Sequence, residues 1–213
     1  MKKKNIALLL SAVLVLVGAV GVTIAWLTEA EGPVTNTFTV GKVNIDLTES
    51  DSKQDTDQNK NTNAYKMIPG FTYVKNPTVT VFANSEDCLV FVKVIENISF
   101  KEGKSGQFTN YIDYQVLTPE WTPLDGTAGV YYRTVSASDG DQLFSVIGYE
   151  KDGIVTKDRI VVKDTVTKDM MDALSAEPTL TFKAAAIQLK KDNTSNFDPA
   201  EAYAKLPEAF KTN

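Results

Sequence analysis

The sequence contains no histidine, so carboxylates and one thiol are the main side chains left that could bind a metal ion, and acid–base chemistry would fall mainly to the carboxylates. This lack excludes Ser-His-Asp and Cys-His arrangements, and it removes both metal ligands of an HExxH zinc site. Carboxylates alone can hydrolyse glycosidic bonds when two of them face one cleft at a defined separation. No spacing in this sequence selects such a pair, so we expect no enzyme, no catalytic residue and no cofactor.

A second candidate for chemistry is the stretch DTDQNKN, which begins like a calcium-binding loop. Asp55, Asp57 and Asn59 stand at alternating positions, as the first ligands of such a loop do. The sixth position is Lys60 where the loop needs glycine, and the twelfth is Lys66 where it needs glutamate. We therefore interpret the stretch as a solvated acidic loop and predict no metal site.

The single cysteine, Cys88, lies in the apolar run CLVFVKV. One cysteine cannot form an intramolecular disulfide, and a thiol in an apolar run is typical of a small buried core residue. We expect Cys88 to pack in the core, and we expect the stability of the chain to come from that core.

The N-terminus has the order of a secretory signal peptide: three lysines, an apolar run from Ile6, and small residues before a cleavage site. Cleavage after Ala25 would make Trp26 the first residue of the mature protein. The alternative is a retained anchor, because the apolar run is long enough to span a bilayer. No basic stop-transfer cluster follows it, which favours cleavage.

Removal of residues 1–25 takes away three lysines and moves the formal charge from −5 to −8. An acidic chain argues against nucleic acid as a partner. Contact with a membrane is expected only through the uncleaved signal peptide.

The pattern of the rest of the chain predicts a succession of β-strands separated by loops and turns. FTVGKVNIDL alternates apolar and polar residues on either side of Gly41-Lys42, where the phase shifts and a bulge or bend is expected. A polar loop covers residues 49–63, and Pro69-Gly70 marks a turn before the next strand. DCLVFVKVIENISF is too apolar for a strand with one wet face, so it is expected at the centre of a sheet.

Two short helices complete the prediction. VTKDMMDALS has Thr167 as its N-cap, and FDPAEAYAKL has Asp198 as N-cap with Pro199 in its first turn. The pattern predicts an all-β sandwich rather than an α/β fold. Its organisation is a signal peptide at 1–25, an N-terminal arm at 26–37, a sandwich domain at 38–192 and a C-terminal segment with a short helix at 193–213.

Several stretches together resemble the TasA/camelysin family, whose members leave the cell through a SipW-type signal peptidase. The resemblance rests on an Ala-aromatic junction, a polar arm, the tripeptide NTF, a glycine turn and an apolar strand. The stretches IPGFTYVKNPTVTVFAN and AAAIQLKKDNTSNFDPAEAYAKL are also similar to segments of this family. At the N-terminus the match is carried by Ala25, Trp26, Asn36, Thr37, Phe38, Gly41, Val43, Ile45 and Leu47.

The resemblance implies a two-sheet jelly-roll sandwich that is secreted and polymerises into extracellular biofilm-matrix fibres of a Gram-positive-type bacterium. Each subunit is thought to place its N-terminal arm as an extra strand in the sheet of its neighbour. The expected assembly residues are Trp26, Leu27, Val34 and Phe38, although Gly32-Pro33 interrupts the arm and proline cannot donate to a strand ladder. The implied partners are further copies of the chain, the signal peptidase, and an accessory protein that nucleates the fibre or anchors it to the cell wall. Some relatives carry a metallopeptidase label, which does not transfer to a chain without histidine.

The alternative function is a monomeric cell-surface binding module that shares only the export signal. It predicts an arm folded onto its own sheet and an exposed aromatic patch, for which Trp121, Tyr131 and Tyr132 are the candidates. The competing interpretation of these three residues is ordinary packing in strands and loops.

Overall fold

A computed structural model describes residues 41–50 and 63–212 of the chain. As predicted, it is mostly β, with several antiparallel sheets and few helices. All described residues belong to one compact unit that begins at Gly41. The signal peptide, the arm and the polar loop after Ser50 lie outside the described residues, except for the loop's last residue, Asn63.

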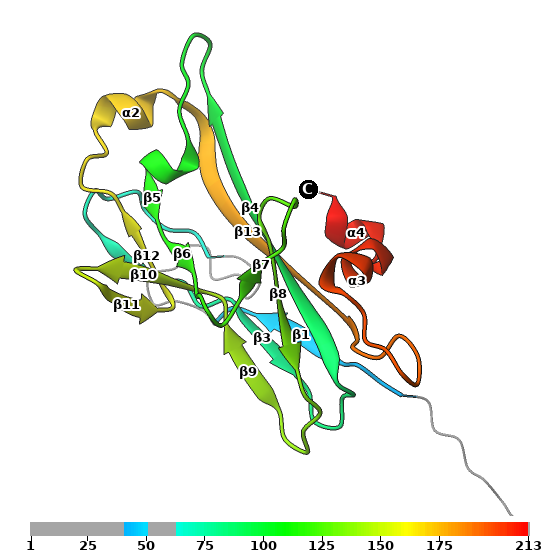
Figure 1. Cartoon of the computed structure of the whole chain (residues 1–213). Helices are drawn as coiled ribbons and strands as arrows, with labels where there is room; N and C mark the ends of the chain where they lie inside the picture. Colours follow the sequence, from blue (N-terminus) through cyan, green and yellow to red (C-terminus); the bar gives the residue numbers. More distant parts are fainter. Residues whose placement is uncertain (1–40, 51–62, 213) are drawn as a thin grey trace, which may run out of the picture. The chain divides into compact units, whose positions relative to one another are not determined.

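The largest sheet has the strand order β13-β4-β8-β7 and is built around the two longest strands (Figure 1). Its strands are β4 (Cys88–Phe100), β7 (Thr122–Pro123), β8 (Val130–Val135) and β13 (Leu174–Gln188). The strand β4 pairs with β13 on one side and with β8 on the other. The prediction that this apolar stretch is a central strand is therefore confirmed.

Nine shorter strands form three further antiparallel sheets of three strands each. The first, in the order β1-β3-β9, contains β1 (Ile45–Thr48), β3 (Thr78–Val81) and β9 (Gln142–Ser145). The second, β2-β12-β5, contains β2 (Thr72–Val74), β5 (Ile112–Asp113) and β12 (Arg159–Val162). The third, β11-β10-β6, contains β6 (Gln115–Val116), β10 (Ile147–Lys151) and β11 (Ile154–Lys157).

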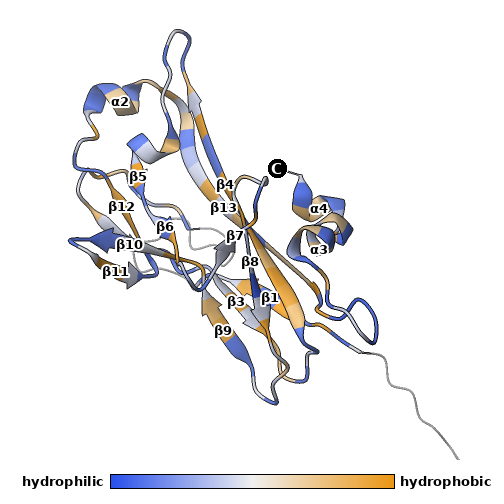
Figure 2. Cartoon of the chain, viewed as in Figure 1, coloured by the Kyte–Doolittle hydropathy of each residue, from blue (hydrophilic) through white to orange (hydrophobic). Residues whose placement is uncertain are grey.

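The main hydrophobic core lies between the inner face of the large sheet and the three smaller sheets. Cys88, Val90 and Val92 of β4 are fully buried in it, together with Val79 and Val81 of β3. In Figure 2 hydrophobic positions gather along β4 and β13, where the two strands pair. The expected packing role of Cys88 is confirmed.

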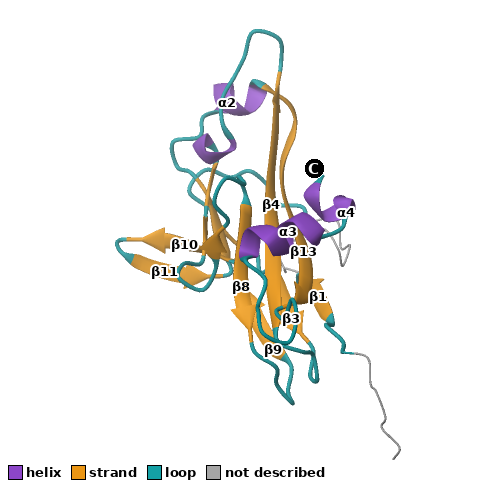
Figure 3. Ribbon diagram, turned by 45° about the vertical axis from the view of Figure 1, so that its right-hand side comes forward, coloured by secondary structure: helices purple, strands orange, loops and turns teal. Residues whose placement is uncertain are grey.

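A second, smaller core covers the outer face of the same sheet. Alternate residues of β4, Leu89 and Phe91, point to this side because successive side chains of a strand face opposite ways. Helices α3 (Pro199–Lys205) and α4 (Glu208–Lys211) pack there through Ala202, Leu206 and Phe210 (Figure 3). The large sheet is thus covered on both faces, which explains why its central strand is so apolar.

The predicted helix caps are present. In helix α2 (Lys168–Asp172) the Thr167 side chain accepts a hydrogen bond from the backbone N–H of Met170, and in α3 Asp198 accepts one from Ala200. Helix α4 and the 3-10 helix η1 (Phe108–Asn110) were not predicted. Leu174, expected in the helix after Val166, is instead the first residue of β13.

Strand β1 is shorter than expected, because residues 41–44 do not join a ladder. The predicted alternation holds, with Val43, Ile45 and Leu47 half-buried between exposed neighbours. Residues 42–44 run beside the turn after β3, where Phe82 and Glu86 donate backbone hydrogen bonds to the carbonyls of Asn44 and Lys42. The bulge or bend expected at Gly41-Lys42 stays a prediction, because the residues before Gly41 lie outside the described part of the chain.

Candidate functional site

The most distinctive feature of the described fold is the outer edge of β13. The stretch TLTFKAAAIQ forms a regular ladder with β4, from Thr179↔Asn97 to Gln188↔Cys88. Between Leu174 and Thr179 the register of this pairing shifts twice. Pro178 lies in this irregular part, where a strand tolerates a residue that has no backbone N–H to donate. Within residues 41–50 and 63–212, β4 is the only strand that pairs with β13, so its other edge has no partner strand.

The inner face of β13 is less well covered beside this edge than the rest of the sheet. Leu174, Leu180 and Phe182 pack against the main core but remain half-buried, whereas Val90 and Val92 of the neighbouring strand are fully buried. Strand β1 lies next to β13 without forming a ladder with it, and among the described strands it pairs only with β3. The edges of β1 and β13 therefore border a gap, called the seam below, where the side chains of the main core stay partly exposed to solvent.

The seam opens into a groove of about 1520 Å³. Its walls come from three parts of the chain: β1 with the residues just after it, the segment from Asn63 to Met67, and the first half of β13. Its buried lining residues belong to the opposite sheet and to η1, and they are Tyr73, Phe108, Ile112, Ile160 and Val162. Buried apolar side chains line the groove together with polar residues such as Asp46, Lys66 and Glu177, and the groove runs along the edge of β13 that has no partner among the described strands.

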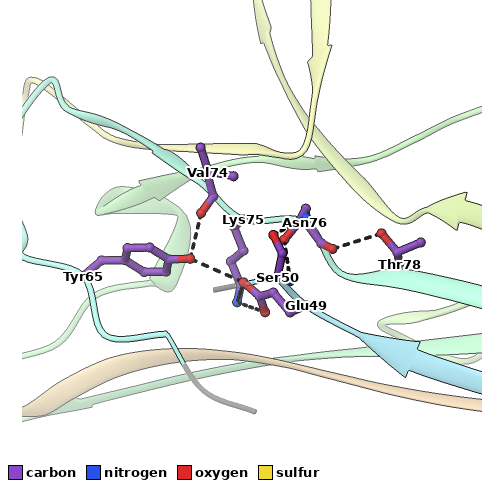
Figure 4. Close-up of polar contacts among 7 residues, drawn as sticks. All are labelled: Glu49, Ser50, Tyr65, Val74, Lys75, Asn76 and Thr78. Carbon is purple, nitrogen blue, oxygen red and sulfur yellow. Dashed lines mark hydrogen bonds and ion pairs between the residues drawn. The ribbon is translucent and has the colours of Figure 1, made fainter. Parts of the chain in front are cut away.

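One end of the groove carries a polar cluster around Lys75, shown in Figure 4. The Lys75 ammonium is 2.9 Å from the nearer carboxylate oxygen of Glu49, and the two side chains are only 8% and 16% exposed. The Tyr65 hydroxyl donates to the carbonyl of Val74 at 2.7 Å and lies 3.4 Å from the same carboxylate. Lys75 also lies over the ring of Phe182, 5.4 Å from its centre, and so reaches across the groove to β13.

A pair of hydrogen bonds next to this cluster fixes the end of β1. The backbone N–H of Ser50 donates to the side-chain oxygen of Asn76 at 3.1 Å, and the amide of Asn76 donates to the Ser50 hydroxyl at 2.7 Å. Together with the Glu49–Lys75 ion pair, these bonds tie β1 to the Lys75-Asn76-Pro77 step. They hold β1 at the groove although no other described strand pairs with it on that side.

The groove lining also includes apolar residues in and around α2 and η1. Met171 and Leu174 belong to the segment that leaves α2 and enters β13, and Met67 and Phe108 line the groove as well. Met170, Met171 and Leu174 all pack against the main core.

Cys88 and Arg133 are buried groups outside the groove. Burial, with the nearby charge of Asp87, raises the pKa of the Cys88 thiol to about 11. Burial lowers the pKa of Arg133, whose guanidinium stacks 3.6 Å from the centre of the Phe144 ring and lies 5.3 Å from that of Trp121. Within the described residues its Nε and Nη1 atoms have no hydrogen-bond partner, and the Phe144 ring lies against the guanidinium.

The aromatic residues expected on an exposed patch do not form one. Trp121 is fully buried and its indole N–H donates to the carbonyl of Ser145 at 2.8 Å. Tyr131 and Tyr132 are half-buried and point to opposite faces of the large sheet, one into each core. The packing interpretation of these residues is therefore the correct one, and the patch prediction is wrong.

The other predicted site residues cannot be placed. Ala25, Trp26, Leu27, Val34 and Phe38 lie outside the described residues, and so do Asp55, Asp57 and Asn59 of the acidic loop. In the described part of the chain, no three or more Cys, Asp or Glu residues come together where they could hold a metal ion. The same part contains no helix with the length and hydrophobicity needed to cross a membrane.

The polar cluster of the groove was missed at the sequence level, although a signal for it exists. Tyr73, Lys75, Pro77, Val79 and Val81 follow one another with a period of two, and all are buried. A lysine in phase with buried residues predicts a buried ammonium with a partner. The partner, Glu49, cannot be identified in this way because it lies 26 positions away.

Comparisons of the chain with protein-family models, with curated proteins and with solved structures found no match.

Proposed function

We propose that this chain is a secreted structural protein that assembles into extracellular matrix fibres, in which the N-terminal arm of one copy fills the groove beside β13 of the next. The observation that carries the proposal is the unpaired edge of β13 next to a groove with half-buried apolar walls. An open edge presents backbone N–H and C=O groups that an added strand can satisfy, while its side chains fill the space below.

The arm is the segment of the chain that suits this role. It precedes the described unit, and its sequence combines Trp26, Leu27 and Val34 with small and polar residues. The polar loop 51–62 contains no apolar residue, so it has no side chains suited to the apolar part of the groove. Since one copy gives an arm and accepts another at a different place, the contact does not close on itself and produces filaments.

The proposal includes a finer description of the fold. The large sheet and the three smaller sheets would form the two layers of a jelly-roll-like sandwich, and the donated strand would complete one of them. Export by a Gram-positive-type bacterium, cleavage after Ala25 and an accessory protein at the cell wall belong to the same proposal. It assigns neither a catalytic residue nor a cofactor.

The alternative of a monomeric binding module is less well supported. It requires exposed aromatic side chains that contact a ligand, and Trp121, the largest candidate, is fully buried.

A substitution in the groove tests the proposal. Leu180→Lys places a charge on the groove wall, and Thr134→Lys places the same charge on an exposed side chain of β8, in the same sheet but outside the groove lining. We expect mature Thr134→Lys protein to form filaments and mature Leu180→Lys protein to stay monomeric, as seen by electron microscopy and light scattering. Circular dichroism should show that both variants are folded. Filaments of Leu180→Lys at the rate of the unchanged chain would refute this acceptor site.

A further inference from the structure

A second strand edge of the described unit is open, and it lies apart from the groove. Strand β11 ends the sheet β11-β10-β6, and among the described strands only β10 pairs with it. The hairpin of β10 and β11 projects from one side of the unit (Figure 1, Figure 3). No described residue of either strand lines the groove, so this edge stays open whether or not the groove is filled.

The residues of β11 favour pairing at this edge. All of them are exposed, and Ile154 and Val155 are 70% and 43% exposed although they are apolar. Natural edge strands are usually guarded by lysines, a proline or a bulge. Strand β11 has one lysine, Lys157, at its last position, and its register with β10 runs without a shift. The edge therefore has little that would keep it from pairing with another chain.

The turn of the hairpin fixes its hydrogen-bond pattern. Asp152 and Gly153 connect the two strands, and both have positive φ angles, 53° and 80°, as in a type I′ turn. In such a hairpin the residues that flank the turn, Lys151 and Ile154, exchange both backbone hydrogen bonds. From there the hydrogen-bonded pairs alternate with pairs that are not hydrogen-bonded.

This alternation shows which backbone groups of β11 face outward. The backbone N–H of Asp158 donates to the carbonyl of Ile147 at 2.9 Å, which is in phase with the pattern. Val155 and Lys157 belong to the other pairs, so their N–H and C=O groups point away from β10. An incoming strand would form its hydrogen bonds at these two residues.

A second copy of β11 fits this edge. Opposite residues of paired strands share a face, so two antiparallel strands related by a two-fold axis place one residue opposite its own copy. With Val155 on the axis, the two Val155 residues exchange backbone hydrogen bonds and Ile154 lies opposite Thr156. At each end, Lys157 of one copy then lies beside Asp152 of the other. The edge is therefore complementary to itself in charge as well as in hydrogen bonds.

Other positions of the axis fit less well. With Thr156 on the axis, the apolar side chain of Ile154 would lie opposite the carboxylate of Asp158. With Ile154 on the axis, Val155 would lie opposite Gly153, which has no side chain to cover it. The axis at Val155 alone brings apolar residues together and opposite charges to the ends.

We propose that β11 is a self-association site, which pairs antiparallel with β11 of a second copy around a two-fold axis at Val155. The contact joins two three-stranded sheets into one and involves neither the arm nor the groove. The strand is short, so a single contact is weak. In a filament the contact would recur in every subunit and the weak contacts would add up, and only this consequence rests on the proposed function.

Disulfide trapping with single cysteines tests the axis. In a Val155→Cys chain the two Cα atoms at this position would lie about 5.5 Å apart, which a disulfide spans. In the matched Thr156→Cys chain each cysteine lies opposite Ile154, and the two cysteines are beyond the ~7 Å limit of a disulfide. Both positions are exposed, and the native Cys88 is fully buried. Mature chains would be incubated under mild oxidation, their free thiols blocked, and the products separated on non-reducing gels.

We expect Val155→Cys to form a discrete covalent dimer at least about tenfold faster than Thr156→Cys. Equal rates would indicate random collisions and overturn the contact, and faster trapping of Thr156→Cys would overturn the position of the axis. Circular dichroism should show that both variants are folded. A dimer band without filaments would refute the proposed function and support this contact, so the two failures are distinguishable.

The charge contact at the two ends is tested on the same background. An ammonium has three donors, so Lys157 can keep its ion pair with Glu120 of its own chain and still contact Asp152 of the second copy. Asp152→Asn removes this carboxylate and keeps a residue that tolerates positive φ. At low salt we expect Val155→Cys/Asp152→Asn to form the dimer about threefold more slowly than Val155→Cys/Asp139→Asn, whose substituted residue is exposed in another turn. Equal rates would overturn the charge contact.

Discussion

Lys75 is the residue at which this fold departs most from a simple apolar core. Its ammonium is almost fully buried, and Glu49 supplies the compensating charge. A buried pair of this kind contributes little net stability compared with apolar residues, yet the removal of one partner leaves an isolated charge in a poor solvent. The pair therefore fixes the position of β1 beside the groove more than it stabilises the fold.

A prediction at this scale concerns Glu49→Gln. The substitution keeps the shape of the side chain and leaves Lys75 without a counter-charge, so we expect the free energy of unfolding to fall by about 3 kcal/mol. The matched control is Glu201→Gln, which breaks the exposed Lys191–Glu201 pair and should cost less than about 1 kcal/mol. Urea unfolding of both variants checks the result, and equal losses would show that Lys75 is well solvated.

Cys88 gives a second residue-scale prediction. Its thiol is fully buried, and burial raises its pKa to about 11, so little thiolate is present at pH 8. We expect Ellman's reagent to label the folded chain at least ~100-fold more slowly than the urea-unfolded chain, whose thiol has an ordinary pKa near 8.5. A Ser136→Cys variant, exposed in the turn after β8, supplies a fast-reacting reference. Fast labelling of Cys88 in the folded state would contradict the packing of β4.

At the scale of elements, the C-terminal helices are held on the sheet by lysines from two neighbouring strands. Lys93 of β4 donates to the carbonyl of Lys211, and Lys183 of β13 donates to those of Ala209 and Thr212, at 3.0 and 2.9 Å. The last carbonyls of a helix lack intrahelical donors and carry partial negative charge, which suits both ammonium groups. These contacts attach α4 to the outer face of β4 and β13, the face turned away from the groove.

This attachment predicts separate effects for the two faces. Phe210→Ala removes the largest side chain of α4 from the second core, and we expect a loss of about 3 to 4 kcal/mol in the free energy of unfolding. Assembly of the mature chain should continue at temperatures where the variant is folded, because the groove is on the opposite face. The exposed Ala209→Ser serves as the control, with an effect below about 1 kcal/mol. Loss of filaments in folded Phe210→Ala protein would connect the helices to assembly.

The sequence pattern predicted individual strands and helices better than it predicted which strands pair with one another. Apolar content placed β4 at the centre of a sheet, and the cap residues Thr167 and Asp198 located two helices, because these features depend on local chemistry. The boundary at Leu174 was missed because a helix of five residues passes directly into a strand, and the apolar spacing suits both. The groove was not predictable, since it depends on the pairing of strands that are far apart in the chain.

At the scale of the whole molecule, the described unit has an open strand edge, and the segment preceding it has the composition of a strand that could close this edge. Under the proposed function, the arm and the groove are a complementary pair within one sequence. If the pair acts between copies, the state of the N-terminus controls polymerisation, because an uncleaved signal peptide tethers the arm to the membrane. Cleavage after Ala25 would then be the step that permits assembly outside the cell.

The most direct measurement is electron microscopy of two purified chains at equal concentration, one that begins at Trp26 and one that begins at Phe38. Both contain every described strand, so circular dichroism should show the same fold. The account predicts filaments from the chain with the arm and monomers from the chain without it. Filaments from both, or from neither over a range of pH and salt, would contradict the claim that the arm of one copy fills the groove of the next.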